Sequence, residues 1–271
     1  MRTTASLRLV TGTRRDDLAE SVAHASSQQV RTSLRVGLPE ISDDWVNCGR
    51  LLSDTAGFAT WRAALAEWLY EQYGDAPERT TAGYVMTWYL GVPGYLAALL
   101  FHHERRVPSL RPEHLAFHTA RPRPHPDSIA ALDDRFVCLP DDPAARSREA
   151  TVVPDEQALA AVLRGRFTAH AARFIEAFAP TVRFGRHTLW AAATDALDDS
   201  MLLAGRYGGD EGAGVLDAEL LLPARLGPLT SGSTIRPSGT GWTRRRESCC
   251  FHYLLAQGKG ACSTCPRLLP K

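Results

Sequence analysis

Four of the six cysteines in this 271-residue chain fall within seventeen consecutive positions, at Cys249, Cys250, Cys262 and Cys265. Isolated cysteines behave as small apolar side chains in a protein core, as we expect for Cys48 and Cys138. Four thiols gathered in a loop-rich tail are more typical of a shared ligand. Their spacing alone leaves two ligands open, a zinc ion held by four thiolates and an iron–sulfur cluster.

The spacing of the four cysteines restricts the backbone between them. Two residues separate Cys262 from Cys265, which lets both thiols point to one side of a tight turn. Cys249 and Cys250 are adjacent, and neighbouring side chains of an extended segment point to opposite faces. Both of these thiols therefore reach one site only from a turn or a distorted backbone.

Cationic side chains flank the cysteines on both sides. Arg244, Arg245 and Arg246 precede the adjacent pair, and Arg267 follows the last cysteine. Nearby cations lower the pKa of a thiol and raise the reduction potential of a cluster, so this composition favours a thiolate cluster over zinc.

The segment from Trp242 to Arg267 reads Trp-Thr-Arg-Arg-Arg-Glu-Ser-Cys-Cys-Phe-His-Tyr and, after a loop, Cys-Ser-Thr-Cys-Pro-Arg. It resembles the C-terminal signature of the FhuF-like ferric siderophore reductases, in which such a motif binds a [2Fe-2S] cluster. Eleven residues separate the second and third cysteines here, whereas the family pattern usually has ten. The resemblance implies that the cluster ligands are Cys249, Cys250, Cys262 and Cys265.

The resemblance also implies the activity of a cytoplasmic ferric siderophore reductase. One electron then comes from an external donor, a ferredoxin or a reduced flavin carrier, and passes to Fe(III) in a siderophore, which we expect to be a hydroxamate. Fe(II) is released because anionic oxygen ligands hold it less tightly. The residues expected to dock the substrate or the donor are Arg244, Arg245, Arg246, Arg267, Trp242, His252 and Tyr253.

The alternative function is a helical scaffold or regulatory protein whose cysteine tail binds zinc or senses iron through a labile cluster. The formal charge of +1 provides no general attraction for nucleic acid, so we expect no nucleic-acid partner. The glycines between 208 and 214 lack the Gly-x-Gly-x-x-Gly spacing of a nicotinamide or flavin site. The chain shows neither a secretory signal nor an apolar run of membrane-spanning length, so we expect no transmembrane segment and a cytoplasmic location.

Apolar periodicity predicts a mainly α fold of the α+β class. One helix is expected to begin after a Ser42 cap and to include Trp45 and Val46, and residues 80–103 are expected to kink or restart at 91–94 because of Pro93. Trp88 and Tyr89 are expected in the core, with a ligand pocket as the alternative. The other expected helices span 13–30, 58–73, 155–178, 186–206 and 215–222.

A proline-rich stretch separates the two helical regions. Residues 114–118 and 135–139 are predicted strands of a small sheet insert near 107–140, and 223–241 has the composition of a loop. We therefore expect a mainly helical body over 1–241 and a [2Fe-2S]-binding segment over 242–271 that packs on it.

Overall fold

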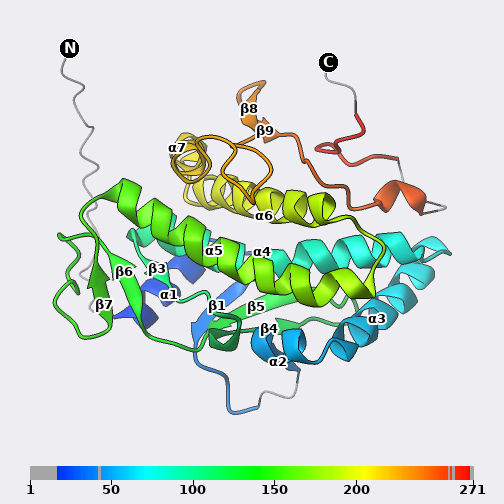
Figure 1. The fold of residues 1–271 in the computed structure, drawn as a ribbon, viewed down its shortest axis with the longest axis horizontal. Helices are drawn as coiled ribbons and strands as arrows, with labels where there is room; N and C mark the ends of the chain where they lie inside the picture. Colours follow the sequence, from blue (N-terminus) through cyan, green and yellow to red (C-terminus); the bar gives the residue numbers. More distant parts are fainter. Residues whose placement is uncertain (1–16, 42–43, 256, 258–259, 269–271) are drawn as a thin grey trace.

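The fold is built around one long buried helix, α4 (Glu78–Glu104). The computed structural model describes residues 17–41, 44–255, 257 and 260–268. Figure 1 shows α4 at the centre, between a sheet on one side and α6 (Arg186–Tyr207) on the other, with α5 (Glu156–Phe178) lying across it. The fold is α+β and mainly helical, as predicted.

Helix α4 runs without interruption through Pro93, so of the kink or restart predicted at 91–94 the restart is wrong. A proline inside a helix costs about 3 kcal/mol because it removes a hydrogen bond and crowds the preceding turn. Here the surrounding turn is buried, including Leu90, Val92 and Leu96. Burial of each such side chain contributes about 1.5–3 kcal/mol, which outweighs the cost of the proline.

Within the described residues, α4 is also the helix that is long and apolar enough to span a membrane. However, 78% of its most apolar stretch is buried inside the protein. Its apolar surface is already covered by other elements, as in the central helix of a packed core.

Four short strands form the larger sheet, in the order β1-β5-β4-β2. They are β1 (Ser33–Val36), β5 (Pro126–Ala131), β4 (Leu115–Thr119) and β2 (Trp45–Asn47). Strand β1 pairs with β5 in parallel, and the other pairs are antiparallel. The predicted strand at 114–118 is thus confirmed as β4, but its partners come from regions where no strand was predicted.

The helix predicted to begin after Ser42 is wrong. Trp45 and Val46 lie in strand β2, where Val46 pairs with Phe117, and Ser42 lies outside the described residues. The helix that follows, α2 (Cys48–Ser53), is capped by Asn47, whose side chain accepts a hydrogen bond from the backbone N–H of Arg50.

A second sheet contains β3 (Val107–Pro108), β6 (Phe136–Cys138) and β7 (Ala150–Val152), in the order β3-β6-β7. The predicted strand at 135–139 is therefore β6. The two predicted strands belong to different sheets rather than to one insert, because β4 pairs with β2 and β5 whereas β6 pairs with β3 and β7.

Three further helices complete the body, α1 (Leu18–Ser27), α3 (Ala56–Tyr73) and α7 (Glu211–Leu221). The helix predicted over 13–30 is shorter at its C-terminal end, and residues 13–16 lie outside the described part. Helix α7 begins earlier than predicted because the side chain of Asp210 accepts a hydrogen bond from the backbone N–H of Ala213.

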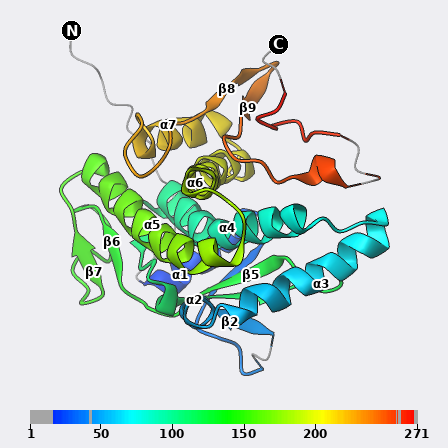
Figure 2. The same ribbon diagram turned by 45° about the vertical axis from the view of Figure 1, so that its right-hand side comes forward.

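The region predicted as a loop over 223–241 contains strand β8 (Ile235–Ser238), which forms a hairpin with β9 (Gly241–Arg244). Figures 1 and 2 show the orange-to-red segment after β9 extending from α6 over the N-terminal end of α4. The hairpin thus delivers the cysteine-bearing segment to the two central helices.

Candidate metal centre

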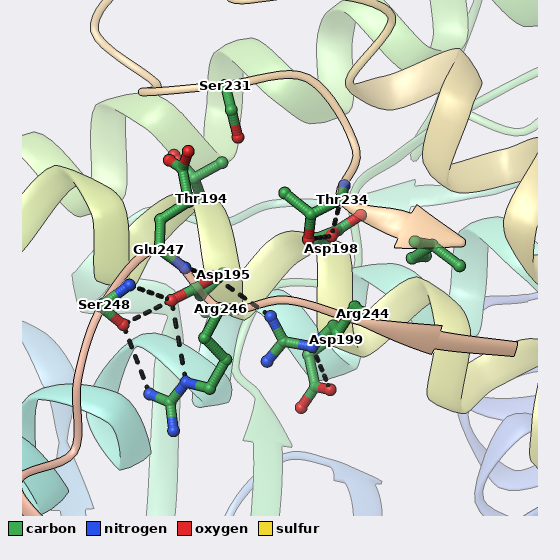
Figure 3. Close-up of polar contacts among 12 residues, drawn as sticks. Thr194, Asp195, Asp198, Asp199, Ser231, Thr234, Arg244, Arg246, Glu247 and Ser248 are labelled. Atoms are coloured by element: carbon green, nitrogen blue, oxygen red, sulfur yellow. Dashed lines mark hydrogen bonds and ion pairs between the residues drawn. The ribbon is translucent and has the colours of Figure 1, made fainter. Parts of the chain in front are cut away.

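One buried carboxylate, Asp195 of α6, holds the segment that precedes the cysteines. Its Oδ1 accepts hydrogen bonds from the backbone N–H of Glu247 at 2.9 Å and from Arg244 Nη1 at 3.1 Å. Its Oδ2 accepts from the backbone N–H and the hydroxyl of Ser248 at 2.7 and 2.5 Å. Figure 3 shows these groups around Asp195, with Arg246 Nε 3.8 Å from Oδ2. Asp195 therefore fixes the backbone directly before the first cysteine.

Two neighbouring carboxylates of α6, Asp198 and Asp199, also hold the chain that leads to the cysteines. Asp199 accepts a hydrogen bond from Arg244 Nε at 2.7 Å, and Asp198 accepts from the backbone N–H and hydroxyl of Thr234 at 3.0 and 2.8 Å. Burial lowers the pKa of a guanidinium, but Asp199 and Asp195 overcome this effect and raise the pKa of Arg244. The charge of Arg244 is thus compensated inside the protein.

The adjacent cysteines are followed by a sharp change of backbone direction at Phe251. This residue has a left-handed backbone, with φ of 58°, which is rare for a bulky side chain. In this conformation its backbone N–H donates a hydrogen bond to Cys249 Sγ at 3.3 Å. The distorted backbone expected at the adjacent cysteines lies at Phe251, directly after the pair.

Several contacts hold Phe251 in this conformation. Its ring stacks on Phe184 at 5.2 Å between centroids, and the guanidinium of Arg79 lies 5.0 Å from its centroid. Its carbonyl accepts a hydrogen bond from the hydroxyl of Thr80 at 2.9 Å. A left-handed non-glycine residue costs about 1–3 kcal/mol and persists where its surroundings fix it, as they do here.

Helix α4 also approaches the backbone of the adjacent cysteines. A Cβ atom at Gly83 would lie 3.0 Å from the carbonyl oxygen of Cys250, so only a glycine allows this contact without a shift. The next residue, Tyr84, has its hydroxyl 2.7 Å from Nδ1 of His252. The N-terminal half of α4 is therefore the surface that receives the cysteine segment.

The two later cysteines lie in a tight turn. The backbone N–H of Cys265 donates to the carbonyl of Cys262 at 2.9 Å, as the two-residue spacing predicts. The backbone N–H of Arg246 donates to the carbonyl of Thr264 inside this turn, also at 2.9 Å. This hydrogen bond ties the turn to the segment held by Asp195.

The four thiols lie close enough to affect one another's ionisation, because Cys250 and Cys265 each act on both Cys249 and Cys262. Cys250 and Cys265 are buried, whereas Cys249 and Cys262 are half-buried. Within the described part of the chain, no three His, Cys, Asp or Glu side chains are grouped as ligands of a single ion. A [2Fe-2S] cluster has four cysteine ligands on two irons, whereas tetrahedral zinc takes four around one ion. By ligand type and number, the four thiols suit either group.

The electrostatics of the thiols also suit a positively charged metal group. Burial raises the pKa of Cys249, and the neighbouring Cys250 and Cys265 raise it further. Burial likewise raises the pKa of Cys262, as does Cys250, while Arg246 lowers it. Thiols that oppose each other's ionisation in this way are stabilised as thiolates when a metal supplies the missing positive charge.

The other residues expected to dock a substrate or donor are spread over this face. Arg245 is exposed and donates to the carbonyl of Pro266 at 3.0 Å, and Arg267 is exposed with its guanidinium 4.3 Å from the ring centroid of Tyr253. Trp242 lies in β9, where its backbone N–H donates to Glu211. Their docking roles remain predictions.

Sequence reasoning missed the residues that position the cysteines, chiefly Asp195 and Phe251. A signal was present for Asp195, because a carboxylate within the apolar run Ala191–Leu197 is buried at helical spacing and must have partners. No such signal marks Phe251, whose left-handed backbone depends on contacts with α4 and Phe184.

Residues 246–267 match the family described as FhuF 2Fe-2S C-terminal domain. The match includes all four clustered cysteines and begins after Trp242 and Arg245. The resemblance expected from the sequence is confirmed for this segment, and with it the [2Fe-2S] cluster. The assignment of its ligands to Cys249, Cys250, Cys262 and Cys265 remains a prediction. No curated protein matches the chain.

Proposed function

We propose that this chain, whose residues 246–267 form a FhuF 2Fe-2S C-terminal domain, is a cytoplasmic ferric siderophore reductase. The observation that carries the proposal is the cysteine motif of that family, whose four thiols lie close to one another. The substrate is Fe(III) in a siderophore, which we propose to be a hydroxamate, and the product is Fe(II).

The reaction consumes one electron for each iron released. A ferredoxin or a reduced flavin carrier is oxidised, and the chelated Fe(III) is reduced to Fe(II). Anionic oxygen ligands hold the trivalent ion much more tightly, so reduction weakens the chelate and lets the iron leave. When bound, the [2Fe-2S] cluster supplies the one-electron redox chemistry between donor and chelate.

The residues of the chain contribute binding, orientation and electrostatics. Asp195 and Phe251 fix the backbone on both sides of the adjacent cysteines. Arg246 places a positive charge that lowers the pKa of Cys262, and positive charge near cluster ligands raises a reduction potential. Half-buried Cys249 and Cys262 leave one side of the site accessible, which suits exchange of electrons with a partner.

The first experiment is anaerobic purification, followed by iron, sulfide and zinc analysis and by EPR after reduction. We expect about two irons per chain and the signal of a reduced [2Fe-2S] centre. Cys262→Ser should lose this signal, whereas Cys138→Ala, which changes a buried cysteine of β6, should retain it.

The second step mixes the reduced protein with a ferric hydroxamate under nitrogen and traps Fe(II) with a coloured chelator. We expect one Fe(II) for each cluster oxidised. One zinc per chain without a visible chromophore would contradict the proposal and favour the zinc-stabilised scaffold or regulator.

A further inference from the structure

A cavity of about 320 Å³ lies between α4, α6, the β4–β5 loop and the segment after β9. Its size is at the lower end of the range of small-molecule sites, about 300–1,000 Å³. Charged and aromatic side chains share its lining, in particular Arg31, Trp88, Tyr95, Arg123, Arg244 and Arg246. Trp88 lines this cavity and also packs against the hydrophobic core, whereas Tyr89 is buried in the core.

The lining of this cavity carries more positive than negative charge. Four arginines and two aspartates line it, which leaves an excess of two positive charges on these six side chains. Arg244 is paired with both aspartates, Asp195 and Asp199. Arg246 reaches only a 3.8 Å ion pair with Asp195, and its buried Nε has no hydrogen-bond partner among the described residues.

The remaining two arginines lie on aromatic rings rather than on carboxylates. The guanidinium of Arg31 is 5.7 Å from the ring centroid of Tyr95, and that of Arg123 is 5.2 Å from that of Trp88. Both arginines are exposed, and within the described part of the chain neither forms an ion pair. Their positive charges are therefore available to an anionic ligand.

The cavity lies next to the thiol site. Arg246 lines it and donates to the hydroxyl of Thr87, another lining residue, at 3.3 Å, while its backbone N–H bonds to the Cys262–Cys265 turn. Trp88 stacks on Tyr84, at 5.4 Å between centroids and 14° between planes. A ligand in this cavity is thus separated from the cysteine segment by single side chains of α4 and by Arg246.

We propose that this cavity binds the ferric chelate, with Arg31, Arg123 and Arg246 facing its anionic oxygen groups. Trp88 and Tyr95 then cover the apolar spacers between those groups. This assignment rests on the proposed reductase function and adds a selectivity to it. Because the lining has excess positive charge, a hydroxamate chelate with a free carboxylate binds more tightly than the same chelate with a free ammonium.

The test uses two Ga(III) trihydroxamates that differ only at one end, a free amine in one and a succinylated amine in the other. Gallium keeps the chelate geometry and is not reduced, so binding is measured apart from electron transfer. Titration of the cluster-loaded protein by calorimetry should show about tenfold tighter binding of the carboxylate chelate at low salt, with the difference falling as salt rises.

Arg31→Gln and Arg123→Gln should each weaken binding of the carboxylate chelate about fivefold and reduce the preference, while the EPR signal of the cluster stays unchanged. The matched control is Arg146→Gln, because Arg146 is exposed in the loop before β7 and does not line the cavity. This variant should bind both chelates as the wild type does.

Equal affinity for the two chelates, no binding of either, or unchanged affinities in both arginine variants would overturn the cavity assignment. If Fe(III) chelates are still reduced in that case, the reductase proposal stands. If the reduced protein leaves Fe(III) chelates unreduced, the reductase proposal fails, whatever the gallium titrations show.

Discussion

At the scale of single residues, the position of the cysteines depends on Asp195, a hydrogen-bond acceptor that is not itself an expected metal ligand. Asp195 is 4% exposed and accepts from two backbone N–H groups, one hydroxyl and one guanidinium. Both carboxylate oxygens of Asp195 accept hydrogen bonds. An asparagine at this position would therefore point its side-chain NH2 group at groups that are themselves donors. The cost of such an unmatched buried group is about 1–3 kcal/mol.

Asp195→Asn is therefore expected to loosen the segment before Cys249 and to speed cluster loss. The visible absorption of the anaerobic protein, followed after addition of an iron chelator, should decay about fivefold to a hundredfold faster than in the wild type. Asp199→Asn is the matched control, because Asp199 is 40% exposed and, among the described residues, bonds only to the side chain of Arg244. Equal decay rates in the two variants would show that Asp195 does not position the site.

The cluster ligands could be predicted from the sequence because they share a residue type and lie within one short segment. Asp195 and Ser248 are 53 positions apart, and nothing local in either segment shows that they meet. Likewise, Arg31 and Arg123 reach the cavity only through the folding of the body. The cluster ligands could therefore be predicted from the sequence, whereas the residues that surround them could not.

At the scale of elements, helices α6 and α7 approach each other through glycines. A Cβ atom at Gly214 would lie 2.6 Å from the carbonyl oxygen of Met201 and 2.9 Å from the Cα atom of Gly205. The glycine run between 208 and 214, which does not fit a nucleotide-binding turn, thus includes a position where two helix backbones touch.

Gly214→Ala is expected to lower the free energy of unfolding by about 1–3 kcal/mol, because the added methyl group must push the two helices apart. The control is Gly165→Ala in α5, where a Cβ atom has no neighbour within 4 Å. That change should instead stabilise the protein by about 0.5–1 kcal/mol through helix propensity. Urea unfolding measures both, and a neutral or stabilising Gly214→Ala would contradict the close contact.

The elements that the sequence predicted well are the long helices with wide apolar stripes, such as α3 and α5. The strands β1, β2, β7 and β8 have three or four residues each, too few for an alternating pattern to stand out. Strand β1 pairs with a strand far along the chain, since Ser33 is the partner of Ser128. Such non-local pairing cannot be read from either segment alone.

At the scale of the whole molecule, a chain of hydrogen bonds in the core links three separate segments. Nδ1 of His170 in α5 donates to the carbonyl of Leu110 at 2.7 Å, and Nε2 accepts from the hydroxyl of Tyr89 in α4 at 3.0 Å. This pattern requires a neutral imidazole, and burial lowers the pKa of His170 to about 4.

Stability is therefore expected to fall as the pH is lowered from about 6.5 to about 4. Over this range the unfolded chain binds a proton at His170 and the folded chain does not, so the free energy of unfolding decreases, by up to about 3 kcal/mol. Urea unfolding at several pH values measures this slope. His170→Gln should have a flatter slope, whereas His187→Gln, which changes an exposed residue, should keep the wild-type slope. Equal slopes in all three proteins would contradict the assignment.

The contacts that receive the cysteine segment have a consequence for the order of events during synthesis. Asp195, Gly83, Thr80 and Phe184 all precede the adjacent cysteines in the chain, so the ribosome makes the receiving surface first. Because folding tends to proceed from the N-terminus during translation, we expect the body to form before all four thiols are available. Cluster insertion would then be a late step on a body that is already folded, and iron starvation would leave a folded apo-protein ready to be loaded.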